Sequence, residues 1–194
     1  MDEKLNKLFL ECKYELKGIG IDIEDSSVGK ITIDVAKRKC KRYGCCKQKN
    51  PDLKSKYYEI VRSRKYKRYA VYKEHNIEIS KWVLELNDDI IKNTIIHELI
   101  HCFPKCNNHG DEFKKYAKYI NYKLGYNISR VGDKEKDLRN NNIEIDKEKY
   151  NYKVECVSCG YVFYRKRMLK NFCRKYRCGY CKGKFDIQNG EFYI

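Results

Sequence analysis

The sequence predicts an α+β protein of two units: a larger one that combines helices with a small antiparallel sheet, and a small cysteine-rich one at the C-terminus. Three observations predict this class. Residues 2–17 and 87–103 have apolar positions at three- and four-residue spacing, residues 30–79 alternate apolar and polar positions in short runs, and cysteines recur in two close pairs after residue 150. A chain of 194 residues is long enough for one ordinary core and one small module.

The first elements of the larger unit follow from these patterns. One apolar stripe predicts an opening helix over residues 2–17. Alternating runs at residues 31–35, 57–61 and 69–72 predict the strands of the sheet, with turns near Gly44 and Asn50-Pro51.

Two further helices and a linker are expected downstream. Asn87 is a typical N-cap residue, and the helix that follows is apolar around most of its circumference, so we expect it in the core. Pro104 predicts its end near residue 103. Another helix is expected from about Asp111 to Leu124. The predicted domains are a larger domain over residues 1–126, a polar linker over 127–149 and a small module over 150–194.

Positive charge is concentrated in two segments. The chain has 43 Lys and Arg against 27 Asp and Glu, a net charge of +16. Residues 29–73 contain 16 bases and 3 acids, and residues 150–194 contain 10 bases and 3 acids. This uneven distribution predicts contact with a polyanion such as a nucleic acid. A basic surface that is only solvated is the alternative.

The eleven cysteines do not predict a secreted protein, because the N-terminus has neither the basic start nor the apolar stretch of a signal peptide. No apolar run reaches the roughly 20 residues that cross a bilayer. We therefore expect an intracellular monomer, in the cytoplasm or nucleoid or in a nucleus, without membrane contact.

The motif His97-Glu98-Leu99-Ile100-His101 lies in the second predicted helix. On a helix, His97 and His101 are one turn apart on the same face, so both imidazoles can bind one zinc ion. Glu98 lies beside them, where a carboxylate takes a proton from zinc-bound water. The motif therefore predicts a catalytic zinc, with Glu98 as the general base of a metallopeptidase.

A catalytic zinc needs a third protein ligand and an open fourth position. The metzincin pattern is excluded, because Pro104 and Asn107 stand where it requires Gly and His. His109 is the only histidine downstream of the motif, and the seven residues before it are enough for the chain to turn back to the metal. Asp111 or Glu112 is the alternative third ligand.

The C-terminal module contains two CxxC pairs, Cys156/Cys159 and Cys178/Cys181, which eighteen residues separate. This spacing predicts a four-cysteine zinc ribbon, so we expect two Zn²⁺ per chain, one catalytic and one structural. Between the pairs, aromatic and basic residues alternate over residues 161–167. This pattern suits base stacking and phosphate contact, and the alternative is that the aromatic rings cover the small core of the module.

Other cysteines and one histidine have no spacing that is typical of a metal site. We interpret His75 as structural, and the adjacent Cys45-Cys46 and the Cys102/Cys106 pair as reduced or buried thiols. The same interpretation applies to Cys12, Cys40 and Cys173.

The chain resembles the SprT-like metallopeptidases, which include the Spartan proteases of DNA–protein crosslink repair. The resemblance consists of the apolar segment Ile77–Ser80, the motif from His97 to His101, His109-Gly110 with Phe113 three residues later, and the terminal ribbon. It implies an α+β minigluzincin-like fold with His97, His101 and His109 on the catalytic zinc. It also implies DNA-stimulated cleavage of proteins that are attached to DNA.

Resemblance and charge together predict DNA as a partner, single-stranded or junction-like, and DNA-bound or DNA-crosslinked proteins as substrates. In the first basic segment no motif aligns with the family, so DNA contact there rests on charge. The candidate DNA-binding residues are Arg62, Arg64, Lys65, Lys67, Arg68, Tyr161, Phe163, Arg165, Lys166 and Arg167.

Two other functions are compatible with the sequence. One is a nucleic-acid-binding zinc protein whose histidine site is structural or vestigial. Glu98 argues against it, because a structural site does not need a carboxylate beside its ligands. The other is an intracellular peptidase that acts independently of DNA.

Overall fold

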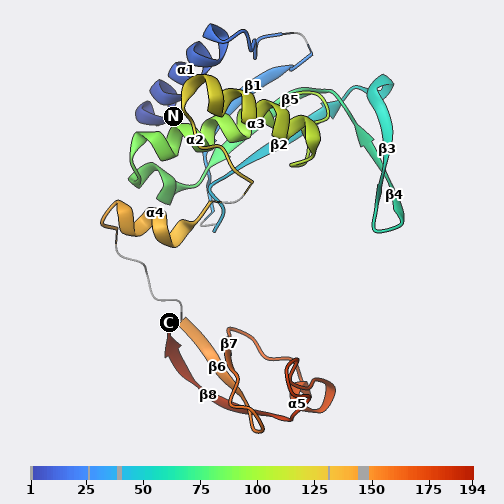
Figure 1. The fold of residues 1–194 in the computed structure, drawn as a ribbon, viewed down its shortest axis with the longest axis vertical. Coiled ribbons are helices and arrows are strands. Elements are labelled where there is room, and N and C mark those ends of the chain that lie inside the picture. Colours follow the sequence, from blue (N-terminus) through green and yellow to red (C-terminus); the bar gives the residue numbers. More distant parts are fainter. Residues whose placement is uncertain (1, 26, 39–40, 131, 144–148) are drawn as a thin grey trace. The chain divides into compact units, whose positions relative to one another are not determined.

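The structure is a computed structural model that describes residues 2–25, 27–38, 41–130, 132–143 and 149–194. It divides into two compact units, Met1–Ile143 and Glu144–Ile194, each of which is described by itself (Figure 1). Helices and small sheets are both present, so the predicted α+β class is confirmed. Among the described residues, no helix is long and apolar enough to cross a membrane.

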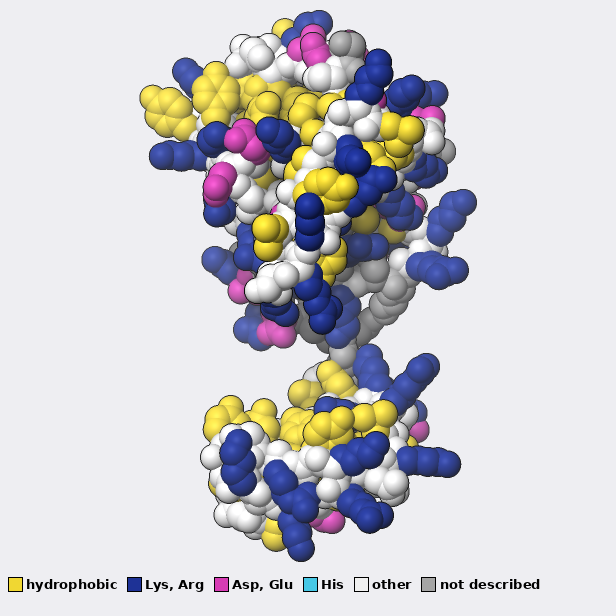
Figure 2. All heavy atoms as spheres, turned by 90° about the vertical axis from the view of Figure 1, so that its right-hand side faces the viewer, with side chains coloured by type: hydrophobic (Ala, Val, Ile, Leu, Met, Phe, Trp, Pro, Cys, Tyr) yellow, Lys and Arg dark blue, Asp and Glu magenta, His cyan; other side chains and the backbone are white. Residues whose placement is uncertain are grey.

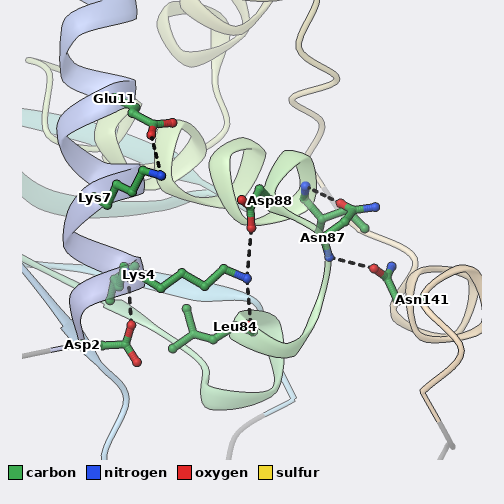
Figure 3. A network of polar contacts seen from close by, with 10 residues as sticks. Asp2, Lys4, Lys7, Glu11, Leu84, Asn87, Asp88 and Asn141 are labelled. Atoms are coloured by element: carbon green, nitrogen blue, oxygen red, sulfur yellow. Dashed lines mark hydrogen bonds and ion pairs between the residues drawn. The ribbon is translucent and has the colours of Figure 1, made fainter.

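Helix α1 (Glu3–Gly18) opens the larger unit and packs through one apolar face. The Asp2 side chain caps it by accepting a hydrogen bond from Leu5 N at 2.9 Å. Lys4 Nζ pairs with Asp88 Oδ1 at 3.0 Å, which ties α1 to the start of α2 (Figure 3). The buried residues of α1 follow the predicted spacing: Leu5, Leu8, Cys12 and Leu16.

Helix α2 (Asp88–Ile100) passes through the core, and a 3-10 helix, η2 (Lys81–Glu85), leads into it. The Asn87 side chain accepts from Ile90 N at 3.0 Å, so Asn87 is the predicted N-cap. Helix α3 (Asp111–Leu124) has the predicted bounds and packs against α2. Apolar residues on most sides of α2 are fully buried: Ile91, Ile95, Ile96, Leu99 and Ile100.

The main sheet has three strands in the order β1–β5–β2, where β1 is Lys30–Val35, β5 is Tyr72–Ile79 and β2 is Gly44–Pro51. β2 is antiparallel to β5, but β1 is parallel to it, so the prediction of an antiparallel sheet is wrong for this pair. A parallel pair needs a long crossover, and residues 36–71 supply it. α1 packs against β1, and α2 packs against β5 and β2.

Strands β3 (Lys56–Val61) and β4 (Arg64–Tyr69) form a separate antiparallel hairpin, which a 3-10 helix, η1 (Leu53–Ser55), precedes. Its two turn residues, Arg62 and Ser63, have φ of 47° and 63°, the conformation that a tight two-residue hairpin turn requires. The hairpin projects from the rest of the larger unit (Figure 1). All residues from 61 to 68 are exposed, so their side chains lie in solvent.

The segment predicted to be a polar linker, residues 127–149, is largely part of the larger unit. It contains helix α4 (Lys134–Asn140), and both Ile128 and Leu138 are buried in the core. Two isolated apolar residues do not stand out in a polar composition, which is why the sequence did not reveal them. The larger unit therefore extends to Ile143. Residues 131 and 144–148 of this segment lie outside the described residues.

The smaller unit is a three-stranded antiparallel sheet of order β7–β6–β8 with one short helix, α5 (Phe172–Lys175). Its strands are β6 (Lys149–Cys156), β7 (Val162–Arg165) and β8 (Phe185–Tyr193). Few of its side chains are fully buried, so the core of this unit is small.

Candidate metal centres and nucleic-acid surface

The three predicted histidines of the larger unit converge. His97 and His101 lie at the C-terminal end of α2, and His109 lies in the loop before α3. Their ligand atoms all lie within 4.8 Å of one another, and His97 Nε2 is 2.9 Å from His109 Nε2. The alternative ligands Asp111 and Glu112 instead pair with lysines of α3. The structure thus brings His109, and not these carboxylates, to the other two histidines.

Backbone carbonyls hold the rings from outside the centre. His101 Nδ1 lies 2.6 Å from Cys106 O, and the Ser129 backbone hydrogen-bonds the His97 ring. A proton on the outer nitrogen leaves the inner lone pair available to a metal. Burial, and then the neighbouring His101 and His109, lower the pKa of His97 to about 4, so this imidazole is neutral near pH 7. Neutral imidazole is the form that binds zinc, and the donor set therefore fits this metal.

Phe113 of α3 supports all three imidazoles. Its ring centroid is 4.8 Å from those of His97 and His101 and 4.7 Å from that of His109. Phe113 is buried, so it forms a fixed wall that restricts rotation of the rings. The helical periodicity identified Phe113 as a packing residue, and its place after His109-Gly110 was the only sign of a link to the site.

Glu98 is buried beside the histidines. Burial, and then the Cys46 side chain, raise the pKa of Glu98 to about 8, and a hydrogen bond from Cys46 N–H opposes this rise. Strand β2 approaches the carboxylate closely, because a Cβ at Gly44 would lie 2.9 Å from Glu98 Cγ and Oε1. Gly44 therefore allows the sheet to contact the carboxylate. The sequence predicted turns near Gly44 and Asn50-Pro51, but Gly44 in fact begins β2 and Asn50-Pro51 ends it.

A cleft of about 870 Å³ lies over the histidines and Glu98. The beginning of β2 forms one side, and the rest of the lining comes from α2, the His109 loop, α4 and described residues between α3 and α4. Tyr43 Oη donates to Asp137 Oδ2 at 2.5 Å, which ties the chain before β2 to α4. β2 is an edge strand of its sheet, so part of its backbone does not pair within the sheet.

The four predicted cysteines of the smaller unit also converge. Cys156 Sγ is 3.4 Å from Cys181 Sγ, and Cys159 Sγ is 3.7 Å from Cys178 Sγ. All four ligand atoms lie within 4.8 Å of one another. Tetrahedral zinc with Zn–S bonds of about 2.3 Å separates two thiolates by about 3.8 Å, so this cluster fits a zinc ion.

The aromatic candidates of the smaller unit divide between core and surface. The Phe163 ring is half-buried and lies 5.4 Å from Phe185 and 6.2 Å from Phe172, so it packs among other rings of this unit. Tyr161 is 43% exposed and lies 4.8 Å from the ring of Tyr180. The guanidinium of Arg165 packs on Phe172, and the other two basic candidates, Lys166 and Arg167, are exposed.

The basic candidates of the larger unit all lie on the β3–β4 hairpin. Figure 2 shows the side of the molecule from which the hairpin projects, and Lys and Arg side chains cover much of it. Lys65 Nζ lies 4.2 Å from the ring of Tyr58, which is half exposed, and Arg68 Nε pairs with Glu59 Oε2 at 3.1 Å. The hairpin therefore presents cations and aromatic rings together: Arg62, Arg64, Lys65, Lys67, Arg68, Tyr58 and Tyr66.

A third group of metal-binding residue types consists of Cys46, His75 and Cys102, whose ligand atoms also lie within 4.8 Å of one another. The sequence suggested separate structural roles for them, because no local spacing connects them. The remaining described cysteines of the larger unit are Cys12 and Cys106, both buried, and Cys45, which is partly buried. Cys40 lies outside the described residues.

The larger unit is thus an α+β domain with a three-histidine candidate metal centre at the end of a buried helix. A model of the SprT-like family matches residues 13–132, which include Glu98 and all three histidines. The chain belongs to this family, and its membership supports a metallopeptidase-like role.

Curated relatives named "Protein SprT-like" agree with this assignment. The chain is 33% identical to one from Oceanobacillus iheyensis over 108 residues, which are 53% of this chain and 61% of the relative. It is 30% identical to one from Bacillus cereus over 118 residues, 58% of this chain and 68% of the relative. For one from Lactococcus lactis the identity is 31% over 116 residues, 60% and 69% of the two chains. The chain therefore spans about 61% of the length of the Oceanobacillus relative.

Proposed function

We propose that this chain is a zinc-dependent endopeptidase with a minigluzincin-like larger unit. In this proposal His97, His101 and His109 hold the metal, and Glu98 is the proton acceptor. The main observation that supports this proposal is that three imidazoles converge beside a buried carboxylate in an open cleft. A structural zinc site is normally closed by four protein ligands, whereas the described residues offer three here. An open position suits a substrate or a water molecule.

Each group in the cleft has a role in peptide hydrolysis. Zinc bound by the three histidines supplies a Lewis acid for the peptide carbonyl and for water. Glu98 accepts the proton of the attacking water and later donates it to the leaving amine. The substrate lies as an extended strand along β2, whose edge borders the cleft at residues 44–46.

We further propose that DNA directs this activity to proteins bound or crosslinked to DNA. An exposed two-stranded ribbon with cations fits the major groove or tracks phosphates, and exposed tyrosines suit stacking on unpaired bases of single-stranded or junction-like DNA. The last residue of β4 contacts the loop that carries His109, because Asn107 Nδ2 donates to Tyr69 O at 2.8 Å. This contact offers a route from bound DNA to His109.

The test is a cleavage assay with the zinc-loaded full chain and a DNA-binding protein as substrate. The arms contain single-stranded DNA, a DNA junction or no DNA. We expect cleavage in the DNA arms, little cleavage without DNA, and none after addition of a chelator. Equal cleavage in all arms would establish a DNA-independent peptidase. DNA binding with no cleavage in any arm would favour a nucleic-acid-binding zinc protein with a structural histidine site.

A further inference from the structure

A largely buried cysteine–histidine cluster lies next to Glu98, and its Cys46 lines the same cleft as the three histidines. Cys46 belongs to β2, His75 to β5, and Cys102 to the turn after α2. Cys46 Sγ lies 3.7 Å from Cys102 Sγ and 3.8 Å from His75 Nδ1. His75 is 2% and Cys102 is 3% exposed, whereas Cys46 is partly buried and lines the cleft, so the cluster is accessible only from the side of Cys46.

The sheet register explains how these residues meet. β2 and β5 are antiparallel, with Cys46 opposite Ile77 and Gln48 opposite His75. Directly opposed residues share a face, so Cys46 and His75 project from the same face of the sheet. Gln48 on this face donates to His101 O at 2.8 Å, which places the end of α2 against it. The turn after α2 then brings Cys102 to the other two side chains.

The spacing matches a thiolate–imidazole metal site. Tetrahedral zinc, with Zn–S near 2.3 Å and Zn–N near 2.0 Å, separates two thiolates by about 3.8 Å and a thiolate from an imidazole nitrogen by about 3.6 Å. The observed separations are 3.7 and 3.8 Å. The four-cysteine cluster of the smaller unit shows the same range, 3.4 and 3.7 Å. A disulfide requires about 2.05 Å, so Cys46 and Cys102 are spaced as co-ligands and not as a bonded pair.

Protein groups alone do not satisfy the buried imidazole. His75 Nε2 has no hydrogen-bond partner among the described residues, although the atom is inaccessible to water. A cation at the cluster bonds to the other ring nitrogen, Nδ1, which faces Cys46, and it neutralises the two thiolates.

We propose that Cys46, His75 and Cys102 bind a zinc ion of their own, in addition to the three-histidine and four-cysteine sites. Two thiolates and one imidazole are a soft donor set that selects zinc over magnesium or calcium. The fourth position takes water or another small donor. This ion joins β2, β5 and the turn after α2. It thereby fixes β2, which contacts Glu98, relative to α2, which carries Glu98.

The position of the ion gives it an influence on the neighbouring centre. Cys46 N–H hydrogen-bonds the Glu98 carboxylate. This contact comes from a residue that the proposed ion holds in place, and Cys46 also lines the cleft. The site thereby positions Glu98 through β2.

The first test uses the native full chain loaded with cadmium and examined by cadmium NMR. The resonance moves downfield as thiolates replace nitrogen ligands, so each ligand set has its own position. We expect three resonances: one from four thiolates, one from three imidazoles, and an intermediate one from two thiolates and an imidazole. A spectrum without the intermediate resonance would overturn the proposal, whatever the outcome for the other two sites.

The second test counts zinc by mass spectrometry in the double variant Cys46→Ala/Cys102→Ala. We expect the zinc content to fall from three to two per chain. Cys12→Ala removes an equally buried thiol of α1 and should keep three zinc ions. Circular dichroism checks that the variants fold. An unchanged count in a folded double variant, or a native chain whose Cys46 and Cys102 are joined as a disulfide, would contradict the site.

Discussion

Asn108 Nδ2 donates to Glu59 Oε1 at 2.8 Å, and this hydrogen bond joins the loop that carries His109 to the basic hairpin. The other carboxylate oxygen of Glu59 pairs with Arg68 at 3.1 Å. One side chain therefore contacts both a candidate DNA-binding arginine and the loop of a candidate metal ligand. If DNA binds as proposed, its phosphates compete with Glu59 for Arg68 and thereby change the surroundings of this loop.

Two substitutions of Glu59 separate these contacts. Glu59→Gln keeps an oxygen that accepts from Asn108, whereas Glu59→Ala removes it, and both remove a negative charge from the basic hairpin. We expect DNA affinity to rise in both variants, and DNA stimulation of cleavage to persist only in Glu59→Gln. Anisotropy titrations and cleavage rates with and without DNA measure the two effects. Equal stimulation in both variants would show that the Asn108–Glu59 hydrogen bond does not couple DNA binding to cleavage.

Gly44→Ala should impair catalysis without removing metal. The added Cβ would lie 2.9 Å from Glu98 Cγ and Oε1, so the buried carboxylate must move. We expect the cleavage rate to fall on the order of 10-fold or more, because misplacement of a general base by a fraction of an ångström is costly. Gly18→Ala is the matched control, since its Cβ meets nothing within 4 Å. Zinc content should stay native in both, and a native rate in Gly44→Ala would mean that the position of Glu98 is not critical.

The affinity for DNA should fall as the salt concentration rises, because cations of the β3–β4 hairpin contact phosphates. Each phosphate contact contributes about 0.7 to 0.9 to the slope of log affinity against log salt, so four contacts give roughly −3. We expect charge reversal at Arg62, Arg64, Lys65 and Lys67 to reduce both the slope and the affinity in anisotropy titrations. Reversal of four exposed lysines of α3, at positions 114, 115, 118 and 123, is the control and should have a smaller effect. Equal effects would indicate general attraction without a defined surface.

Base stacking by the smaller unit should be independent of salt. Tyr161 is exposed beside Tyr180, whereas Phe163 is half-buried against Phe172 and Phe185, so Tyr161→Ala tests stacking with the smaller effect on the fold. We expect lower affinity for single-stranded DNA, by about 1–3 kcal/mol, at an unchanged salt slope. Phe163→Ala should instead lower the unfolding temperature of this unit. Unchanged affinity in Tyr161→Ala would mean that Tyr161 does not stack on bases and that only Lys and Arg side chains contact DNA.

Local patterns predicted the parts of the molecule whose partners are near in sequence. Helical periodicity located α1, α2 and α3, and the four-residue spacing of His97 and His101 predicted that they share a face. His109, twelve residues from His97, still lay within reach of a short loop. The two CxxC pairs were equally visible, because each pair is local.

Long-range pairings were not predictable from such patterns. Strand alternation does not show that β1 pairs with β5 in parallel across residues 36–71. Cys46 is 29 residues from His75 and 56 from Cys102, so only the sheet register and the end of α2 reveal their cluster. Gly44 looked like a turn residue, since the contact that requires a glycine is with Glu98, far along the chain.

The most direct test of the proposed centre compares native protein with Glu98→Gln at equal zinc content. The substitution is nearly isosteric and leaves His97, His101 and His109 intact, but it removes the proton acceptor. The readout is the cleavage of a DNA-bound protein by native protein and by Glu98→Gln, with DNA present. Zinc is counted in the same samples. The account predicts native zinc and fold in Glu98→Gln with a loss of cleavage on the order of 100-fold or more. Comparable cleavage by the two proteins would contradict it.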